Sequence, residues 1–302
     1  MAAPKHSYVS VLLWMLEAAL FDAVCSLARL FPVDSVSAAG GWLFGKLGPL
    51  IRGNRVAERN LRIAFPDADK AELQRLLRAH WTELGRSLAE FTIVDRIVAE
   101  TGRLEVEGAD RLRAIAAGGG PVVFISGHFS NFELMAAAII KAGVTCQITY
   151  RALNNPYVDA RVRAQRFKYG VRLFAPKGLQ GARALMRALQ RGESVALMND
   201  QKFNGGVAAP LFGVMAHTAP GPSTYALRFG IPIMPMSVQR TGPGARFRII
   251  VHDPIRLEDT GDRDADIEAG VRRINAFIED RVRARPAEWF WVHRRWPNEV
   301  YR

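Results

Sequence analysis

The chain has 302 residues, and 49% of them are hydrophobic, which is enough for one large domain or two modest ones with a sizeable core. A mainly disordered state is excluded. With 41 lysine and arginine residues against 29 aspartate and glutamate residues, the net charge of +12 favours acidic partners: nucleic acid, anionic lipid head groups or an acidic carrier protein. Two cysteines, Cys25 and Cys146, provide neither a disulfide framework nor metal-ligand spacing.

The first expected element is an apolar helix over residues 7–31. Glu17 and Asp22 interrupt it, so it lacks the unbroken run of ~20 apolar residues that is typical of a transmembrane helix. A cleaved signal peptide also fits poorly, because the basic region is only Lys5 and His6 and no small-residue cleavage site follows. Two interpretations stay open: a helix lying in a membrane interface, and an amphipathic core helix.

A second apolar segment, at 38–51, places Trp42 among glycines, and the basic stretch 52–59 follows it. Aromatic residues beside arginines are typical of an anchor next to anionic head groups. The two segments together favour a membrane surface. We therefore expect an N-terminal anchor over residues 1–52 and an enzymatic domain over residues 53–302.

Residues 67–94 carry apolar side chains at helical spacing, with Asp69 as the expected N-cap. Strands are then expected at 103–108, 121–126, 146–151, 171–175 and 194–200, and helices at 109–117, 130–143, 155–170 and 178–192. Two more strands, at 231–240 and 246–255, are expected as an antiparallel pair at the sheet edge. The alternation predicts an α/β fold with a largely parallel central sheet flanked by helices.

One strand end carries the most informative residues. The strand at 121–126 is followed by His128, and Glu133 lies in a helix for which Ser130 or Asn131 is the expected cap. In open α/β sheets the chemistry takes place at such strand ends. A carboxylate that holds the Nδ1–H of a histidine leaves Nε2 free to take a proton from a hydroxyl. We expect His128 in the loop, Glu133 in the first helical turn and a hydrogen bond between them; the alternative is a capping or packing histidine beside a surface glutamate.

The motif GHFSNFE resembles the H-x4-(D/E) motif of the bacterial late acyltransferases of lipid A biosynthesis, the lauroyl and myristoyl transferase family within the lysophospholipid acyltransferase-like superfamily. Four further blocks are similar to the same family and come in its order: RVAERNLRIAFPD (55–67), YRALNNPYVDARVRAQR (150–166), MNDQKFNGGVAAPLFG (198–213) and PAEWFWVHRRW (286–296). The resemblance extends over residues 40–297.

The resemblance implies transfer of a fatty acyl group from an acyl carrier protein thioester to a hydroxyl of a lipid A precursor, at the cytoplasmic face of the inner membrane. His128 would be the general base, and Glu133 would orient the imidazolium and balance its charge. Arg166 matches a family arginine and is assigned to oxyanion or phosphate binding, with Arg151 as the second candidate; for either one the alternative is a solvated helix face. Asp200 matches the family's aspartate, which would bind the acceptor or hold an arginine, or else cap its loop.

Other functions fit parts of the sequence. An acyltransferase of the same fold could act on another glycolipid or an aminolipid with acyl-CoA as donor, and no motif excludes it. A basic, non-enzymatic protein that binds membrane or nucleic acid would explain the charge, but the expected nucleic-acid motifs are missing, so we expect no nucleic acid partner. A serine hydrolase and a P-loop enzyme are disfavoured by the lack of their motifs. No metal-ligand cluster is visible in the sequence, and no cofactor is expected.

Three other histidines, His217, His252 and His293, are not expected to be catalytic. His217 is placed in a loop before a helix, and the other two lack a carboxylate at useful spacing. His293 belongs to the C-terminal block 286–296, whose tryptophans and arginines are expected to form packing and a head-group surface.

Overall fold

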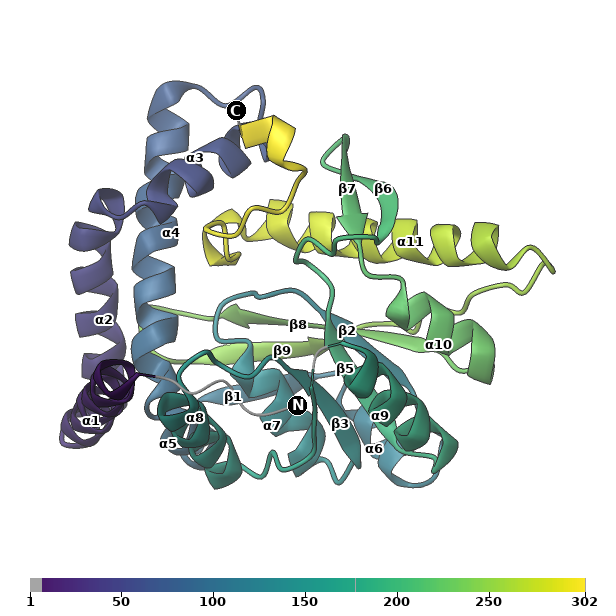
Figure 1. The fold of residues 1–302 in the computed structure, drawn as a ribbon, viewed down its shortest axis with the longest axis horizontal. Coiled ribbons are helices and arrows are strands. Elements are labelled where there is room, and N and C mark those ends of the chain that lie inside the picture. Colours follow the sequence, from purple (N-terminus) through teal and green to yellow (C-terminus); the bar gives the residue numbers. More distant parts are fainter. Residues whose placement is uncertain (1–6, 177, 302) are drawn as a thin grey trace.

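The computed structural model describes residues 7–176 and 178–301, and a seven-stranded sheet forms its centre (Figure 1). The strands of this sheet are β1 (Leu104–Glu107), β2 (Val123–Ser126), β3 (Cys146–Tyr150), β4 (Phe174–Pro176), β5 (Ser194–Met198), β8 (Ile233–Arg240) and β9 (Phe247–Val251). A separate antiparallel hairpin consists of β6 (Val207–Leu211) and β7 (Val214–Thr218).

Helices precede the sheet, connect its strands and follow it. The α-helices are α1 (Tyr8–Arg29), α2 (Val33–Leu47), α3 (Gly53–Ala64), α4 (Lys70–Phe91), α5 (Val94–Ala99), α6 (Ala109–Ala116), α7 (Glu133–Lys141), α8 (Pro156–Lys168), α9 (Leu179–Gln190), α10 (Gly221–Phe229) and α11 (Arg263–Ala284). Short 3-10 turns are η1 (Gly48–Leu50), η2 (Pro286–Glu288) and η3 (Asn298–Tyr301). The predicted α/β class and its alternation of strands and helices are confirmed.

The strand order is β1-β9-β8-β2-β5-β3-β4, and the sheet is largely parallel. The β8–β9 pair is antiparallel, so β9 and its parallel neighbour β1 run opposite to the other five strands. The crossovers β2–α7–β3 and β4–α9–β5 progress across the sheet in opposite directions. Because such crossovers are right-handed, α7 and α9 cover opposite faces. The winding therefore reverses between the neighbouring strands β2 and β5, where open α/β sheets bind ligands.

Strand β2 lies in the middle of the sheet, and all four of its residues are buried. Its register with β5 pairs Val123 with Val195 and Ser126 with Met198. Helices cover both faces, so the strand has no solvent side, and this explains its continuous apolar sequence.

The N-terminal helices form a layer beside the sheet, in which α2 packs along the long helix α4 (Figure 1). Gly40 of α2 faces Gly85 of α4, and a side chain on either one would collide with the backbone of the other. The glycines in the second apolar segment thus allow two helix backbones to approach closely. Asp69 caps α4 as predicted, accepting a hydrogen bond from the backbone N–H of Glu72 at 2.8 Å.

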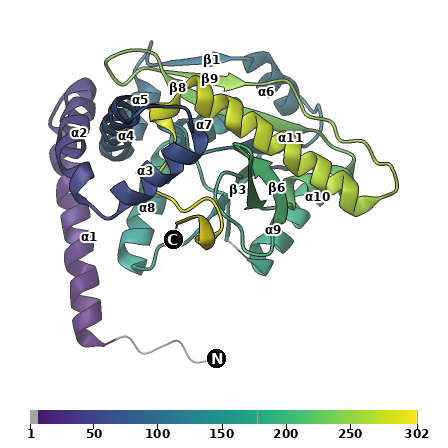
Figure 2. The same ribbon diagram turned by 90° about the horizontal axis from the view of Figure 1, so that it is seen from above.

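Helix α1 is long and apolar enough, by length and composition, to cross a membrane. Its apolar stretch of 18 residues has a mean hydropathy of 1.8, and 11% of this stretch is buried inside the protein. In the part of the chain that the structure describes it is the single helix that meets this test. It lies beside α8 (Figure 2).

Several expectations about local structure are wrong. The β8–β9 pair is not at the sheet edge, because β1 continues the sheet beyond β9. Ser130 and Asn131 do not cap α7: its N-cap is Phe132, without a side-chain hydrogen bond. His217 lies in strand β7 rather than in a loop, because this part of the chain forms the hairpin β6–β7, which the sequence pattern did not indicate.

Candidate active site

His128 and Asp200 meet at the carboxyl ends of β2 and β5. Ser126 and Met198 are register partners, and each candidate residue comes two positions after its strand's last residue. Neighbouring parallel strands in register deliver equivalent positions to the same edge of the sheet. The register of β2 with β5 therefore places the imidazole beside the carboxylate.

Asp200 receives three hydrogen bonds. Its Oδ1 lies 2.7 Å from Nδ1 of His128, and its Oδ2 accepts from the His128 backbone N–H at 2.7 Å and from Nε1 of Trp289 at 2.8 Å. The carboxylate is buried, with 3% of its side chain exposed. Burial alone would raise the Asp200 pKa, but the positive charge of His128 and these hydrogen bonds outweigh it and lower the pKa to about 2. Asp200 is thus ionised at neutral pH and holds Nδ1–H of the imidazole.

The His128 ring is partly exposed, at 18% of its side chain, and lines a pocket. Phe132 packs edge-on against it, with ring centroids 4.8 Å apart. Nδ1 is engaged by Asp200, and Nε2 has no hydrogen-bond partner among the described residues. Nε2 is therefore available to accept a proton from a bound hydroxyl.

The loop that carries His128 is held in place by the C-terminal segment. Gly127 is needed because a side chain there would press on Phe129, and Phe129 bridges to Trp289. Ser130 has a φ of 43° and donates its backbone N–H to the Glu288 carbonyl at 2.7 Å. The C-terminal segment therefore fixes both the loop conformation and, through Trp289, the carboxylate of the histidine.

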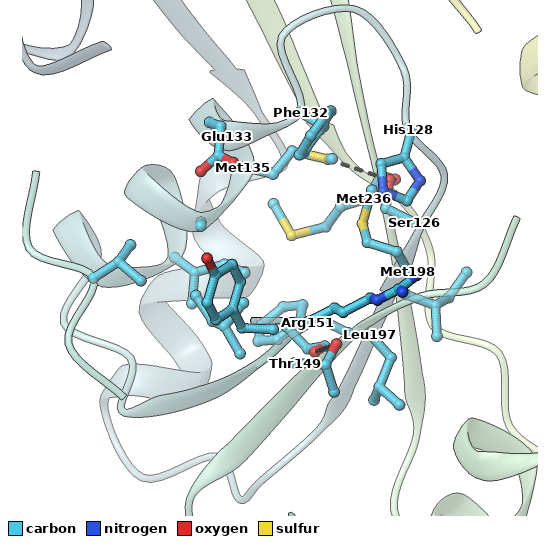
Figure 3. Close-up of a pocket in the computed structure, with 18 of the residues that line it drawn as sticks. Ser126, His128, Phe132, Glu133, Met135, Thr149, Arg151, Leu197, Met198 and Met236 are labelled. Carbon is cyan, nitrogen blue, oxygen red and sulfur yellow. Dashed lines mark hydrogen bonds between the residues drawn. The ribbon is translucent and has the colours of Figure 1, made fainter. Parts of the chain in front are cut away.

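The expected hydrogen bond between Glu133 and His128 is not formed. His128 lies in the loop and Glu133 opens α7, as predicted, but in Figure 3 the two side chains lie apart. The Glu133 carboxylate instead accepts from Nε and Nη2 of Arg166, at 2.9 and 2.5 Å, and from the Tyr169 hydroxyl at 2.6 Å. The first helical turn directs Glu133 towards α8, while Asp200 occupies the Nδ1 side of the imidazole.

Arg166 and Glu133 form a buried bidentate pair. Both side chains line the same pocket as His128, with 16% and 7% of their side chains exposed. The Arg166 guanidinium lies over the Tyr150 ring, 4.7 Å from its centroid. Burial would lower the Arg166 pKa, but the Glu133 charge and hydrogen bonds raise it above its ordinary value. Nη1 forms no hydrogen bond within the described residues, so this permanently charged group has a free donor.

The pocket has a volume of about 420 Å³ and lies between the sheet and helices α7 and α8 (Figure 3). Its wall is mainly apolar and includes Met135, Met198 and Met236; methionine side chains adapt to flexible ligands. The polar residues that line the pocket are Ser126, His128, Glu133, Thr149, Tyr150, Arg151, Arg166, Gln201 and His293. An apolar cavity with a few convergent polar groups is typical of a small-molecule or lipid site.

Of the five residues predicted for the site, four line this pocket: His128, Glu133, Arg166 and Arg151. Asp200 lies directly behind His128. Arg151 is exposed, and it has no hydrogen-bond or ionic partner among the described residues. The structure therefore brings the predicted residues together, with a different pairing of the two carboxylates.

The C-terminal block 286–296 supports the site in a way that its sequence did not indicate, because its tryptophans were expected to pack. Trp289 does pack, at 2% exposure, but it also donates to Asp200. Arg295, placed on a head-group surface, is buried and donates to the His217 carbonyl and to Thr218. Burial lowers the Arg295 pKa to about 10. A tryptophan indole can donate from within a core, and this dual use leaves no periodic signal in the sequence.

The basic N-terminal block also has a structural use. Asn60 donates to the carbonyls of Trp291 and His293, at 2.7 and 2.8 Å, and accepts from the Tyr301 hydroxyl at 2.6 Å. Asn54 accepts from the Trp81 indole at 2.7 Å. Helix α3 thus fastens the C-terminal segment that supports the histidine loop.

The remaining histidines are placed as follows. His252 bonds to Ser237 at 2.8 Å, and burial together with nearby arginines lowers its pKa to about 4. His217 lies near the Gly206 carbonyl, at 3.2 Å. His293 lines the pocket, which its sequence position did not suggest. Within the described residues no cluster of three or more potential metal ligands is found.

A histidine held by a carboxylate at the reversal point of an α/β sheet, beside an apolar pocket, is typical of enzymes that transfer or hydrolyse acyl groups. The family model described as bacterial lipid A biosynthesis acyltransferase matches residues 6–298. The chain belongs to this family, and it is an acyltransferase.

Individual proteins that are similar to this chain have names that agree with the family, although their sequence identity to it is low. The lipid A biosynthesis lauroyltransferase of Escherichia coli (strain K12) is 26% identical over 253 residues, which cover 81% of this chain and 79% of that protein. The palmitoleoyltransferase of the same strain is 25% identical over 257 residues, covering 82% and 79%. A lipid A biosynthesis acyltransferase of Haemophilus influenzae is 26% identical over 263 residues, covering 84% and 81%.

Among the similar solved structures is the 1-acyl-sn-glycerophosphate acyltransferase PlsC of Thermotoga maritima. It covers 85% of this chain and 97% of its own, with 12% identity and a TM-score of 0.38, a likeness too weak to carry an argument.

Proposed function

We propose that this acyltransferase moves a fatty acyl chain from an acyl carrier protein thioester to a hydroxyl of a lipid A precursor at the inner membrane. The observation that carries the mechanism is the 2.7 Å contact between Nδ1 of His128 and Asp200, beside an apolar pocket. Family membership supports the acceptor class.

In the proposed reaction, Nε2 of His128 takes the proton of the acceptor hydroxyl while that oxygen attacks the thioester carbonyl carbon. Asp200, rather than Glu133, holds the ring orientation and balances the imidazolium charge. Collapse of the tetrahedral intermediate breaks the C–S bond, and the imidazolium proton goes to the departing thiolate. The products are an ester and a free thiol, and His128 returns to its neutral form.

The intermediate carries an oxyanion that needs a positive hydrogen-bond donor. We assign this role to Arg166, whose Nη1 is free among the described residues and whose guanidinium is fixed by Glu133 and Tyr169. Glu133 is then a positioning residue, since it acts through Arg166. Arg151, exposed at the pocket wall, is assigned to a phosphate of the acceptor or to the acidic donor.

The apolar pocket would hold the acyl chain, and the net charge of +12 is complementary to an acidic carrier protein and to anionic lipid. The test uses the purified full chain in mild detergent with a lipid A precursor and either an acyl carrier protein or a CoA thioester. Mass spectrometry should show a product heavier by one acyl group, formed faster from the carrier protein, and none with His128→Ala.

Failure to acylate the lipid A precursor with either donor would contradict the proposal. Product formed solely from acyl-CoA on another glycolipid or an aminolipid would favour the alternative acyltransferase. Full activity of His128→Ala would contradict the mechanism.

A further inference from the structure

The two acidic residues that interrupt the apolar sequence of α1 both have partners on α8. Glu17 Oε2 accepts from Nδ2 of Asn155 at 2.7 Å, and Asp22 Oδ2 accepts from Nε of Arg161 at 2.6 Å. Asn155 also donates to the Trp14 carbonyl at 3.0 Å. Glu17 and Asp22 therefore dock α1 on the body of the protein.

The docking continues along one stripe of the helix. Between residues 11 and 28, the positions that are at least partly buried are 11, 14, 18, 21, 25 and 28, and all the others are exposed. This three-and-four spacing is that of a narrow helix–helix seam. Ala18 and Cys25 are its most buried members, at 1% and 6% exposure, and the Cys25 thiol faces Gln165.

The order of the contacts gives the relative direction of the two helices. Glu17 meets Asn155, Asp22 meets Arg161 and Cys25 meets Gln165, so position rises together in both. Helices α1 and α8 therefore run parallel, side by side, and Figure 2 shows the pair at the edge of the molecule.

The surface of α1 outside this seam is apolar and exposed. Nine large apolar residues of this helix are exposed, from Tyr8 at 96% to Val24 at 48%. So extensive an apolar surface on one helix fits hydrocarbon rather than water. The occupant that the composition favours is a lipid bilayer.

Helix α8 decides how α1 meets that bilayer. It carries Arg161, Arg163, Arg166 and Lys168, and Arg163 has 48% of its side chain exposed. A helix of 22 residues is about 33 Å long, close to the hydrocarbon thickness of about 30 Å, so a spanning α1 would place its middle section at mid-bilayer. That middle section is the part docked on α8. A spanning orientation would therefore carry a charged helix into hydrocarbon, which is strongly unfavourable.

We propose that α1 is a monotopic anchor that lies along the membrane surface, with its exposed apolar face in one leaflet and its seam on α8. The proposal goes beyond the acyl-transfer reaction and does not depend on it. It also accounts for the apolar pocket lying next to the anchor, since Leu153 of the pocket wall is two positions before Asn155, the N-cap of α8 at which α1 docks.

Cysteine labelling in cells tests the orientation. In a full-chain Cys25→Ser, Cys146→Ala background, single cysteines are introduced as Tyr8→Cys, Val9→Cys and, as a matched control on the body, Arg62→Cys. All three positions are exposed, Arg62 with 47% of its side chain, so none of these substitutions disturbs packing. Intact spheroplasts and lysed cells are treated with a membrane-impermeant maleimide.

We expect no labelling of any of the three in intact spheroplasts. After lysis we expect labelling of Arg62→Cys, and labelling of Tyr8→Cys and Val9→Cys once detergent removes the bilayer. Labelling of Tyr8→Cys or Val9→Cys before lysis, with Arg62→Cys protected, would mean that α1 spans the bilayer and would overturn the proposal. Labelling of all three before lysis would overturn it equally. Recovery of the background protein in the soluble fraction would exclude a lipid occupant.

A charge reversal tests the seam independently. Asp22→Arg should release α1 and expose Cys25 of the natural chain to a permeant thiol reagent at least tenfold faster, and the double variant Asp22→Arg, Arg161→Asp should restore protection. Leu20→Arg, on the exposed face, should leave Cys25 protected while it weakens sedimentation with membranes. Unchanged Cys25 reactivity in Asp22→Arg would contradict the role of the pair.

Discussion

His128 and Asp200 are 72 positions apart in the chain, and Nδ1 of the histidine lies 2.7 Å from Oδ1 of the aspartate. The contact follows from the register of β2 with β5, which places both residues just beyond paired strand ends. Glu133, the carboxylate that is near in sequence, belongs to Arg166 instead.

Asp200→Asn should lower kcat by about 10²–10⁴-fold with little change in KM, because an amide can donate to Nδ1 and so favour the wrong imidazole tautomer. Steady-state kinetics with saturating donor would measure this. Glu133→Gln is the comparison, since it leaves the Asp200 contact intact. If Asp200→Asn kept full kcat while Glu133→Gln changed the pH dependence of the base, the pairing in the structure would not be the catalytic one.

Trp289→Phe should lower kcat by about tenfold or more, because it removes a hydrogen bond to a buried charged group, worth about 1.5–3 kcal/mol. It should also raise the Asp200 pKa from about 2, since one of the donors that lower it is lost. Steady-state kinetics at neutral pH would measure the loss of kcat. Trp291→Phe is a matched control: its indole donates to the Pro286 carbonyl at 2.6 Å and not to Asp200.

Glu133→Gln should destabilise the protein as well as slow it. Arg166 has 16% of its side chain exposed, so losing its carboxylate leaves a nearly buried charge unpaired, at a cost of about 3–5 kcal/mol for a fully buried pair and less here. Urea unfolding would give the change in the free energy of unfolding. Glu58→Gln, which breaks the exposed pair with Arg62, should change this free energy by less than about 1 kcal/mol. Equal effects from the two substitutions would argue against a structural role for the Glu133 pair.

Ala136→Leu should shift the preference towards shorter acyl chains. Ala136 lines the apolar pocket, and a leucine there would fill space that the chain is proposed to occupy. Competition between thioesters of different lengths, read out by mass spectrometry, gives the ratio of kcat/KM values. An unchanged ratio, in a variant that folds normally, would mean that the acyl chain lies elsewhere.

The contribution of Glu288 to the stability of the protein should fall as pH rises from about 4.5 to 7. Burial and the nearby Glu83 charge raise the Glu288 pKa from 4.5 to about 7, against the opposing arginines. The folded state therefore holds the Glu288 proton more tightly than the unfolded state does. The stabilisation is complete below pH 4.5 and is lost as pH rises through 7, by about 3 kcal/mol at most.

Glu288→Gln should flatten that part of the profile of melting temperature against pH, because glutamine resembles the protonated acid. Glu299→Gln, at an exposed position, should leave the profile unchanged. Profiles of the same shape for the natural protein and Glu288→Gln would contradict the expectation.

Part of this site was predictable because it depends on local order along the chain. The run PVVFIS required a buried strand, and the residues after it were therefore placed at a strand end with a helix to follow. The position of Asp200 after β5 was predictable in the same way. Each of these positions can be predicted from the alternation of strands and helices along the chain alone.

The pairing of the carboxylates was not predictable, because sequence distance is a poor guide to spatial distance in a doubly wound sheet. Glu133 is five positions from His128, but the start of α7 directs it to Arg166 of α8 and to Tyr169, the C-cap of that helix. The hairpin β6–β7 was missed because Pro210 interrupts the strand pattern of β6. The donor role of Trp289 depends on a contact across 89 positions.

The amino-acid sequence by itself determined the fold class, the identity of the histidine and the family resemblance, since these depend on periodicity and on short motifs. The tertiary structure decided which carboxylate holds His128 and what Glu17 and Asp22 do in an apolar helix. Both depend on which side chains the strand register and the helix packing bring into contact. The free energy that decides them comes from contacts between residues far apart in the chain, which no local pattern encodes.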